Sequence, residues 1–303
     1  MSSRHLVRRG DEIDLAPGLG EGFRRWPVVD ETTPGAVHTA FAISELEPGG
    51  RLPAHVHSFE DSLYLLEGEV VMDTAEGSFR LRPGDYGVSA VGVPHALRNV
   101  STSPARWATM FAPQPRARMD GDTYFFPVSP LEEVQPRAVD VRDPRTRSFG
   151  HIDPGNVDVD RQTQDMLAVS ASMRTALLVY SGITVKMMID AEMGARLLTM
   201  FMVQYEPEGF AGPHDHPFEE TYLILEGEVD AAFDGERYLL RPGDVAFAGV
   251  GCVHEFACAG DGRVRWLETQ APQPPSRHSY RFVRDWAYLQ ERLGSADGGT
   301  GRQ

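Results

Sequence analysis

The chain has 303 residues, a hydrophobic fraction of 41% and a net charge of −15, from 44 acidic and 29 basic residues. This length suits two domains of about 150 residues each. The acidic balance disfavours nucleic acids and anionic membrane surfaces as partners, because both are recognised by basic patches. There is no apolar run of about 18 residues or more, and the N-terminus lacks the apolar region of a secretory signal. We therefore expect a cytoplasmic protein.

From residue 36 onward the first half of the chain is predicted to be β-structure. Apolar residues alternate with polar ones, and residues 63–66 and 69–72 have the composition of strands. Arg82-Pro83-Gly84-Asp85 predicts a type II turn, because proline stands at its second position and glycine at its third. This half therefore predicts a small barrel of short antiparallel strands.

Residues 117–160 are rich in Asp, Arg and Pro and are predicted to connect two domains, residues 1–135 and 136–303. Beyond the connection, residues 177–180 and 183–187 are predicted strands. Residues 198–203 form a nearly continuous apolar run, which is typical of a strand buried on both faces. Residues 284–293 carry apolar side chains at helical spacing and predict one short C-terminal helix.

The histidines suggest a metal site. His214 and His216 are two residues apart, so on a strand their side chains share one face. Glu220 follows them, and His254 lies further downstream. Glu220 has matching parity if the strand continues, but Pro217 is equally compatible with a bend that brings Glu220 in from a neighbouring strand. Three imidazoles and one carboxylate can together bind a divalent ion.

The same set occurs earlier in the chain as His55, His57, Asp61 and His95, at a constant offset of 159 residues. The offset also relates Arg82-Pro83-Gly84-Asp85 to Arg241-Pro242-Gly243-Asp244. An ungapped internal duplication therefore covers about residues 46–116 and its second copy. We predict one divalent ion in each copy.

These motifs resemble those of the cupin superfamily. The first cupin motif matches Gly49, His55, His57, Asp61 and Gly68, and again Gly209, His214, His216, Glu220 and Gly227. The second motif matches Gly84, Gly92, His95 and Asn99, and again Gly243, Gly251 and His254. Departures at Ala90, Gly249 and Cys258 affect turn and packing positions. The resemblance implies an all-β bicupin, with two tandem jelly-roll barrels that each hold a metal.

Three imidazoles and a carboxylate leave two positions of an octahedral ion open. Mn, Fe, Ni, Co and Zn all suit such ligands, and ligand type does not choose between them. An open position lets the ion polarise a substrate oxygen, acidify bound water or bind dioxygen. The leading interpretation is a dioxygenase-type oxidoreductase acting on a small organic molecule. The alternatives are a metal-dependent hydrolase resembling ureidoglycine aminohydrolase, and a non-enzymatic metal- or ligand-binding protein. A homodimer is left open as an assembly.

Further site residues are expected on the inward faces of the second barrel. Tyr222 shares the parity of Glu220, and both are candidate catalytic residues. Lys186 is a third candidate catalytic residue. It stands mid-strand among apolar residues, where it either extends to solvent or pairs with a substrate carboxylate. Cys252 is expected to be a small core residue, with thiol ligation as the minor alternative. Because Glu220 reaches further than Asp61, we predict that the second site is the principal catalytic one.

Overall fold

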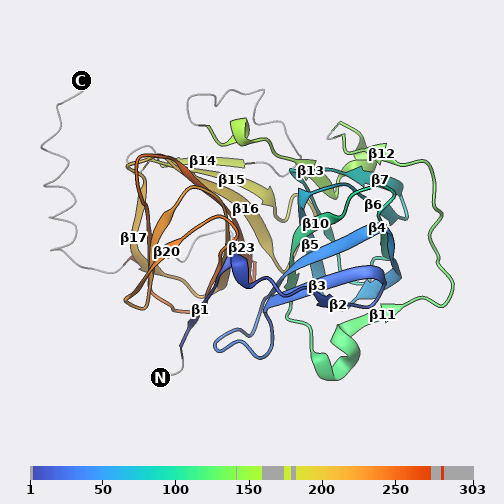
Figure 1. Cartoon of the computed structure of the whole chain (residues 1–303), viewed down its shortest axis with the longest axis horizontal. Coiled ribbons are helices and arrows are strands. Elements are labelled where there is room, and N and C mark those ends of the chain that lie inside the picture. The colour runs from blue at the N-terminus through green and yellow to red at the C-terminus, as the bar shows by residue number, and fades with distance from the viewer. Residues whose placement is uncertain (1–2, 141, 159–173, 179–181, 274–280, 283–303) are drawn as a thin grey trace, which may run out of the picture.

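Two β-barrels make up the protein, as Figure 1 shows. The computed structural model describes residues 3–140, 142–158, 174–178, 182–273 and 281–282. The predicted all-β fold of two tandem jelly-roll barrels is confirmed. The helix predicted at residues 284–293 lies outside the described residues. In the described part of the chain, no helix has the length and apolarity needed to cross a membrane.

The first barrel is one continuous sheet of 12 strands. Its long strand β4 pairs with β3, β10, β9 and β11, and in this way links both halves of the barrel. The strands are β2 (Ala16–Pro17), β3 (Glu21–Val29), β4 (Ala40–His57), β5 (Glu60–Glu67), β6 (Val70–Thr74), β7 (Gly77–Leu81), β8 (Asp85–Ser89), β9 (His95–Arg98), β10 (Ala105–Ala112), β11 (Thr123–Phe125), β12 (Arg137–Ala138) and β13 (Phe149–His151). The chain also forms short 3₁₀ helices, η1 (Gly10–Glu12), η2 (Ala117–Asp122), η3 (Pro144–Thr146) and η4 (Pro154–Asn156).

The second barrel consists of a seven-stranded and a five-stranded sheet. The larger sheet contains β1 (His5–Arg8), β14 (Arg174–Leu178), β15 (Ile183–Ile189), β16 (Thr199–Tyr205), β18 (Glu219–Glu226), β21 (Val245–Ala248) and β23 (Val264–Ala271). The smaller sheet contains β17 (Phe210–Asp215), β19 (Val229–Phe233), β20 (Glu236–Leu240), β22 (His254–Cys258) and β24 (Arg281–Phe282).

The predicted type II turn is present in both copies. In the first copy Asp85 N donates to Arg82 O at 2.8 Å, and Gly84 has a φ of +90°. In the second copy Asp244 N donates to Arg241 O at 2.9 Å, and Gly243 has a φ of +91°. Glycine adopts this backbone conformation without steric cost. Each turn reverses the chain shortly before the strand that carries the third histidine.

An apolar layer lies between the two barrels. On β16, Phe201 and Val203 belong to the core of the second barrel, whereas Met200 and Met202 belong to the layer shared with the first barrel. Every residue of β16 is buried. The prediction that this apolar run forms a strand buried on both faces is therefore confirmed.

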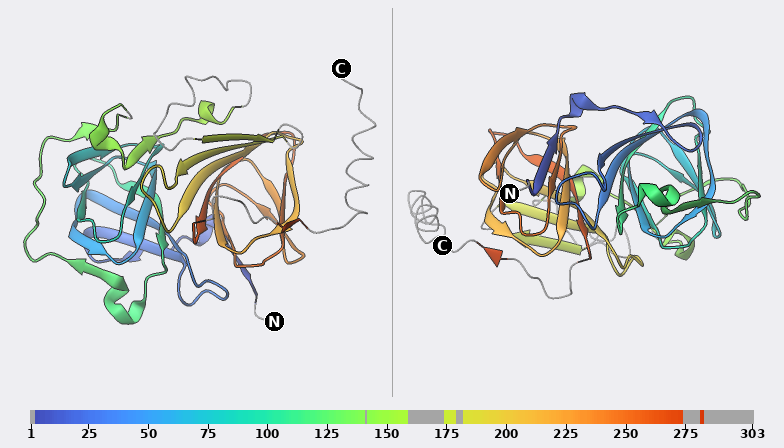
Figure 2. Two further views of the ribbon diagram at one scale, coloured as in Figure 1. Left: turned by 180° about the vertical axis from the view of Figure 1, so that it is seen from behind. Right: turned by 90° about the horizontal axis from the view of Figure 1, so that it is seen from below.

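The two halves of the chain exchange edge strands. The N-terminal strand β1 pairs with β21 of the second barrel, as the blue strand on the orange barrel shows in Figure 2. Conversely, β13 lies beyond residue 135 and pairs with β8 of the first barrel. The domain boundary at residue 135 remains a prediction, and strands pair across it in both directions.

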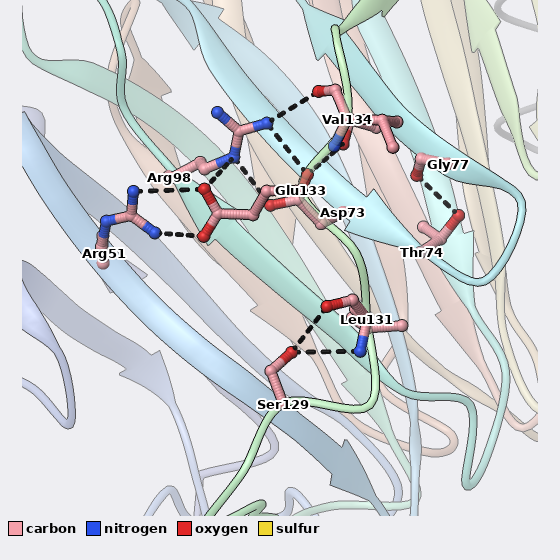
Figure 3. Close-up of polar contacts among 10 residues, drawn as sticks. Arg51, Asp73, Thr74, Gly77, Arg98, Ser129, Leu131, Glu133 and Val134 are labelled. Atoms are coloured by element: carbon pink, nitrogen blue, oxygen red, sulfur yellow. Dashed lines mark hydrogen bonds and ion pairs between the residues drawn. The ribbon is translucent and has the colours of Figure 1, made fainter.

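The connecting segment is bound to the outside of the first barrel by ion pairs. Arg51 binds the Glu133 carboxylate, and Arg98 Nη2 donates to Val134 O at 3.4 Å. Arg98 Nε also donates to Asp73 Oδ2 at 2.8 Å. Figure 3 shows both arginines directed at this segment. Asp73 and Arg98 therefore join strands β6 and β9 to the connection.

Candidate metal centres

The second histidine set converges beside strands β17, β18 and β22. His214 ends a region of β17 that pairs with β22, and it lies directly opposite His254 in the register. Glu220 comes from β18, because the chain bends between Asp215 and Glu219, as the proline had suggested. The ligand nitrogens of His214, His216 and His254 lie within 4.8 Å of one another. All four side chains are buried.

The first histidine set repeats this arrangement. His55 and His57 lie near the end of β4, His95 begins β9, and His55 lies opposite His95 in the register. Their ligand nitrogens also lie within 4.8 Å of one another. Asp61 is on β5, directly after the bend that follows β4. The structure thus brings together each predicted ligand set.

Hydrogen bonds orient the rings of the second set. Nδ1 of His214 donates to Gly212 O at 2.7 Å, and Nδ1 of His254 donates to Cys252 O at 2.9 Å. Nδ1 of His216 donates to the carbonyl of Phe218 at 3.0 Å, and the two rings stack at 3.9 Å. A carbonyl only accepts, so the proton is on Nδ1 and the lone pair on Nε2 is left for a metal.

The first set is oriented in the same way. Nδ1 of His55 donates to Pro53 O at 2.6 Å, and Nδ1 of His95 donates to Val93 O at 3.0 Å. Nδ1 of His57 lies 3.0 Å from Thr123 Oγ1, whose own hydroxyl donates to a backbone carbonyl. Thr123 therefore accepts the proton of His57. This residue of β11 had no signal in the sequence, because its role depends on a strand pairing.

The donor sets fit a divalent transition metal. Burial and neighbouring imidazoles lower the pKa of His55 to about 3 and the pKa values of His95 and His214 to about 4. These rings are neutral at pH 7, as ligation requires. Within the described residues, Nε2 of His57, His95 and His254 is buried without a hydrogen-bond partner. Buried ring nitrogens without partners are unfavourable, and a metal ion would satisfy them.

The two carboxylates lie at different distances from the histidines. Glu220 Oε2 is 2.7 Å from His216 Nε2 and 3.4 Å from His254 Nε2. Asp61 Oδ2 is 3.6 Å from His57 Nε2 and 4.0 Å from His95 Nε2. Burial acts against ionisation, yet the adjacent imidazoles hold the pKa of both carboxyls below the usual range. The shorter side chain of Asp61 therefore leaves a wider gap in the first set.

Comparison with known proteins identifies the family. Residues 42–111 and 201–269 each match the cupin domain family. This protein is a bicupin. No curated protein sequence matches the chain.

Solved structures with the same two-barrel fold have low sequence identity to this bicupin. An oxalate decarboxylase from Lactobacillus farciminis, solved with formate, has a TM-score of 0.62 and 16% identity, over 97% of this chain and 94% of that one. A Pseudomonas aeruginosa protein described as glyoxylate-induced has a TM-score of 0.63 and 16% identity, over 93% and 92% of the two chains. Protein YlbA from E. coli has a TM-score of 0.59 and 14% identity, over 91% and 94%. At these identities the likeness shows the fold alone.

Polar side chains surround Glu220 inside the second barrel of this bicupin. The Tyr222 hydroxyl donates to Glu220 Oε2, and Gln270 Nε2 donates to Glu220 Oε1 at 2.5 Å. Thr199 Oγ1 donates to Gln270 Oε1 at 3.2 Å, which orients the amide. Glu268 lies opposite Tyr222 in the register and accepts a hydrogen bond from Trp266 Nε1 at 2.9 Å. Burial and the charge of Glu220 raise the pKa of Glu268 well above its usual range.

The first barrel lacks this polar shell. In the duplicated register, Leu63 stands at the position of Tyr222 and Phe111 at that of Gln270. Thr109 stands at the position of Glu268 and donates to Asp61 Oδ1 at 2.7 Å. Apart from its histidines, the first carboxylate therefore accepts a side-chain hydrogen bond from one hydroxyl among the described residues.

Lys186 lies on a different face of the second barrel. It is opposite Met202 in the β15–β16 register and shares the face of Met188, in the layer between the barrels. The residues of β15 that pack on the barrel core are Ile183, Val185 and Met187. Burial lowers the pKa of Lys186 to about 8. The structure does not bring Lys186 to the histidines, and its predicted catalytic role has no support there.

The two cysteines are not joined. Cys252 is buried, Cys258 is partly buried, and both are free thiols. Burial raises the pKa of Cys252 to about 12, and its backbone carbonyl accepts the bond from His254. The expectation of a small core side chain at position 252 fits this placement.

Proposed function

We propose that this bicupin is a metal-dependent enzyme acting on a small organic molecule, and that its principal catalytic centre is in the second barrel. The observation that carries the proposal is the hydrogen-bonded group of Glu220, Tyr222 and Gln270, next to Glu268. A site that only stored a metal would need the ligands and their orientation. It would not need a second, protonated carboxyl group inside the same barrel.

The residues of the second barrel have two proposed roles, metal ligation and the positioning of the ligating carboxylate. His214, His216, His254 and Glu220 would hold one divalent transition metal, which when bound supplies Lewis acidity and open coordination positions. Tyr222 and Gln270 fix the two oxygens of Glu220 separately, so this carboxylate cannot rotate freely.

Glu268 is the residue that would transfer a proton. Burial and the charge of Glu220 raise its pKa well above the usual range, which favours the protonated form of its carboxyl group. A carboxylic acid held in this state can donate a proton to a substrate atom. Trp266 Nε1 fixes one of its oxygens at 2.9 Å, and the Glu268 carboxyl group also interacts with that of Glu220.

Two reaction classes follow from this arrangement. Dioxygenase chemistry is the first candidate, since three imidazoles and a carboxylate leave positions for substrate and dioxygen together. Acid–base chemistry without dioxygen, such as hydrolysis or decarboxylation, is the second candidate, and the protonated Glu268 favours it. The likeness to oxalate decarboxylases is a likeness of fold and does not choose between the two.

Turnover with and without oxygen separates these classes. Metal-loaded protein would be offered small hydroxy acids, oxo acids and ureides, while oxygen uptake and the release of carbon dioxide and ammonia are followed. A dioxygenase consumes oxygen and stops under anaerobic conditions, whereas a hydrolase or decarboxylase continues. Glu268→Gln should reduce turnover in the second case. Metal-loaded protein that turns over none of these compounds would favour a binding role instead.

A further inference from the structure

An arginine side chain of the first barrel lies over two of its aromatic rings. Arg25 is on β3, opposite Ser44 in the β3–β4 register. It shares its sheet face with Phe23, a core residue of the first barrel, while the neighbouring Arg24 is on the other face. The guanidinium carbon is 5.0 Å from the ring centroid of Phe23 and 4.9 Å from that of Phe111. Phe111 is in turn opposite Asp61 in the β5–β10 register.

Arg25 uses little of its hydrogen-bonding capacity. Its Nε donates to Ser44 Oγ at 3.2 Å, and this is its only hydrogen bond to the described residues. Within the described part of the chain, no carboxylate lies within ion-pair distance of it. Burial lowers the pKa of Arg25, and the more distant charge of Asp61 opposes this shift. Arg24 differs, because its Nη2 lies 2.5 Å from both Glu45 and Glu47.

The two aromatic rings compensate Arg25 only in part. The attraction between a cation and an aromatic ring is weak. Withdrawing a cation from water costs more than this attraction returns unless the cation is paired. Arg25 is partly exposed as a residue, so the cost is smaller than that of a fully buried cation. Its remaining N–H donors form a planar fork of the kind that binds a carboxylate in two places.

The duplicated register shows that this arginine belongs to the first barrel alone. Val185 pairs with Val203 where Arg25 pairs with Ser44, so valine stands at the arginine's position in the second barrel. Ala42 and Ser44 likewise stand where the second barrel has larger side chains. The small side chains make room for the guanidinium. The two barrels therefore differ in a matched way on both strands, with a large residue on one strand and small residues on the other.

We propose that the first barrel is a binding site for a small organic carboxylate, whose carboxylate group is held by Arg25 next to Phe111. The positive charge selects an anion, the planar fork favours a carboxylate, and Phe23 and Phe111 offer an apolar wall to the organic part. A metal at the first histidine set adds positive charge and strengthens the preference. This site is separate from the proposed catalytic centre and does not depend on turnover.

Calorimetric titration of the metal-loaded protein with acetate tests the proposal, with inorganic phosphate as the second probe. The test variant is Arg25→Met, which keeps an apolar chain between the two rings. Arg24→Met is the matched control, since it removes a neighbouring arginine from the outer face. Arg25→Lys keeps the charge but loses the fork. We expect acetate to bind at least about tenfold more weakly to Arg25→Met, and unchanged to Arg24→Met.

Thermal unfolding supplies the second readout. Acetate should raise the Tm of the wild type and of Arg24→Met, and should raise it less or not at all in Arg25→Met. The dependence on Arg25 should persist after the metal is removed with a chelator. Acetate binding that is equal in wild type and Arg25→Met would overturn the proposal. So would phosphate binding as tight as acetate. If Arg25→Met fails to fold, Arg25→Lys carries the test, and acetate binding as tight in Arg25→Lys as in the wild type would overturn the role of the guanidinium fork.

Discussion

Glu60 and Glu219 occupy the same position in the two copies of the repeat, and each binds a backbone loop of the opposite barrel. Glu60 on β5 accepts hydrogen bonds from the N–H groups of Arg196 and Leu197, at 2.7 and 2.9 Å. Glu219 on β18 accepts from the N–H groups of residues 37–39, at 2.7 to 3.1 Å. Each glutamate directly precedes the carboxylate of a histidine set. The two barrels are thus joined next to both sites.

Removing either carboxylate should loosen the contact between the barrels. Hydrogen bonds from backbone N–H groups to a charged acceptor contribute about 1.5 to 3 kcal/mol each, so Glu60→Ala should lower the free energy of unfolding by about 2 kcal/mol or more. Glu219→Ala should have a similar effect. Urea denaturation measures both, with the exposed Glu67→Ala as the control. Losses no larger than that of Glu67→Ala would mean that the barrels are held by their apolar layer alone.

The contribution of the buried ion pair between Asp73 and Arg98 to stability can be tested with the residues found at the equivalent positions of the second barrel. The second barrel has Ala232 and Ala257 at these positions. Asp73→Ala alone should cost about 3 kcal/mol, because it leaves Arg98 with only the exposed Glu133 carboxylate, 3.7 Å from its Nε. The double variant with Arg98→Ala reproduces the second barrel and should cost less than the sum of the single changes. Urea denaturation of all four proteins gives the coupling energy, and strict additivity would contradict the pairing.

Stability should fall with rising pH through His151. Its Nδ1 lies 2.7 Å from Asp85 Oδ1, and this hydrogen bond raises the pKa of His151 in the folded state, against the effect of burial. A histidine whose pKa is higher in the folded protein than in the unfolded chain stabilises the fold when it is protonated. This contribution is complete below the pKa of the unfolded chain, about 6.5, and is lost as the pH rises through the pKa of the folded protein.

The measurement is the difference in unfolding free energy between the wild type and His151→Gln, taken at about pH 6 and about pH 8.5. Since β13 carries His151 onto the first barrel, the wild type should have its larger advantage at the lower pH. An advantage that is independent of pH, or that grows with pH, would show that the ring is not charged in the folded protein.

The two metal-site carboxylates should differ in importance. Glu220 is closer to its histidines than Asp61 and is held by Tyr222 and Gln270. Glu220→Ala should lower turnover by about 100-fold or more, whereas Asp61→Ala should lower it by about tenfold or less. Dialysis against a chelator should also remove the metal of the first site before that of the second. Equal metal affinities, with Asp61→Ala the more damaging change, would contradict the asymmetry.

Much of the fold was predictable because the chain repeats itself. The offset that separates His55 from His214 also separates the other ligands of the two sets, so a chance pair of surface histidines is excluded. The two-residue spacing within each histidine pair predicted that both side chains lie on the same face of a strand. Turn residues such as Gly84 require a positive φ and therefore identify their turns. These features are local or repeated, so a single sequence records them.

The remaining features depend on contacts between distant strands. The position of Arg25 between two aromatic rings, the exchange of β1 and β13, and the hydrogen bond of Thr123 to His57 have no local signature. The face of the sheet on which Lys186 lies depends on the register of β15. A shift of one residue would move its side chain to the opposite face. Parity within a strand cannot tell which of two packed sheets a side chain faces.

Elemental analysis of the purified protein shows whether both histidine sets bind metal. We expect close to two equivalents of divalent transition metal per chain. His216→Ala and His57→Ala should each contain about one equivalent, and the control His38→Ala should keep two, because His38 contacts Glu219 only through its backbone N–H. An unchanged metal content in both His216→Ala and His57→Ala would contradict the assignment of the two histidine sets as metal centres.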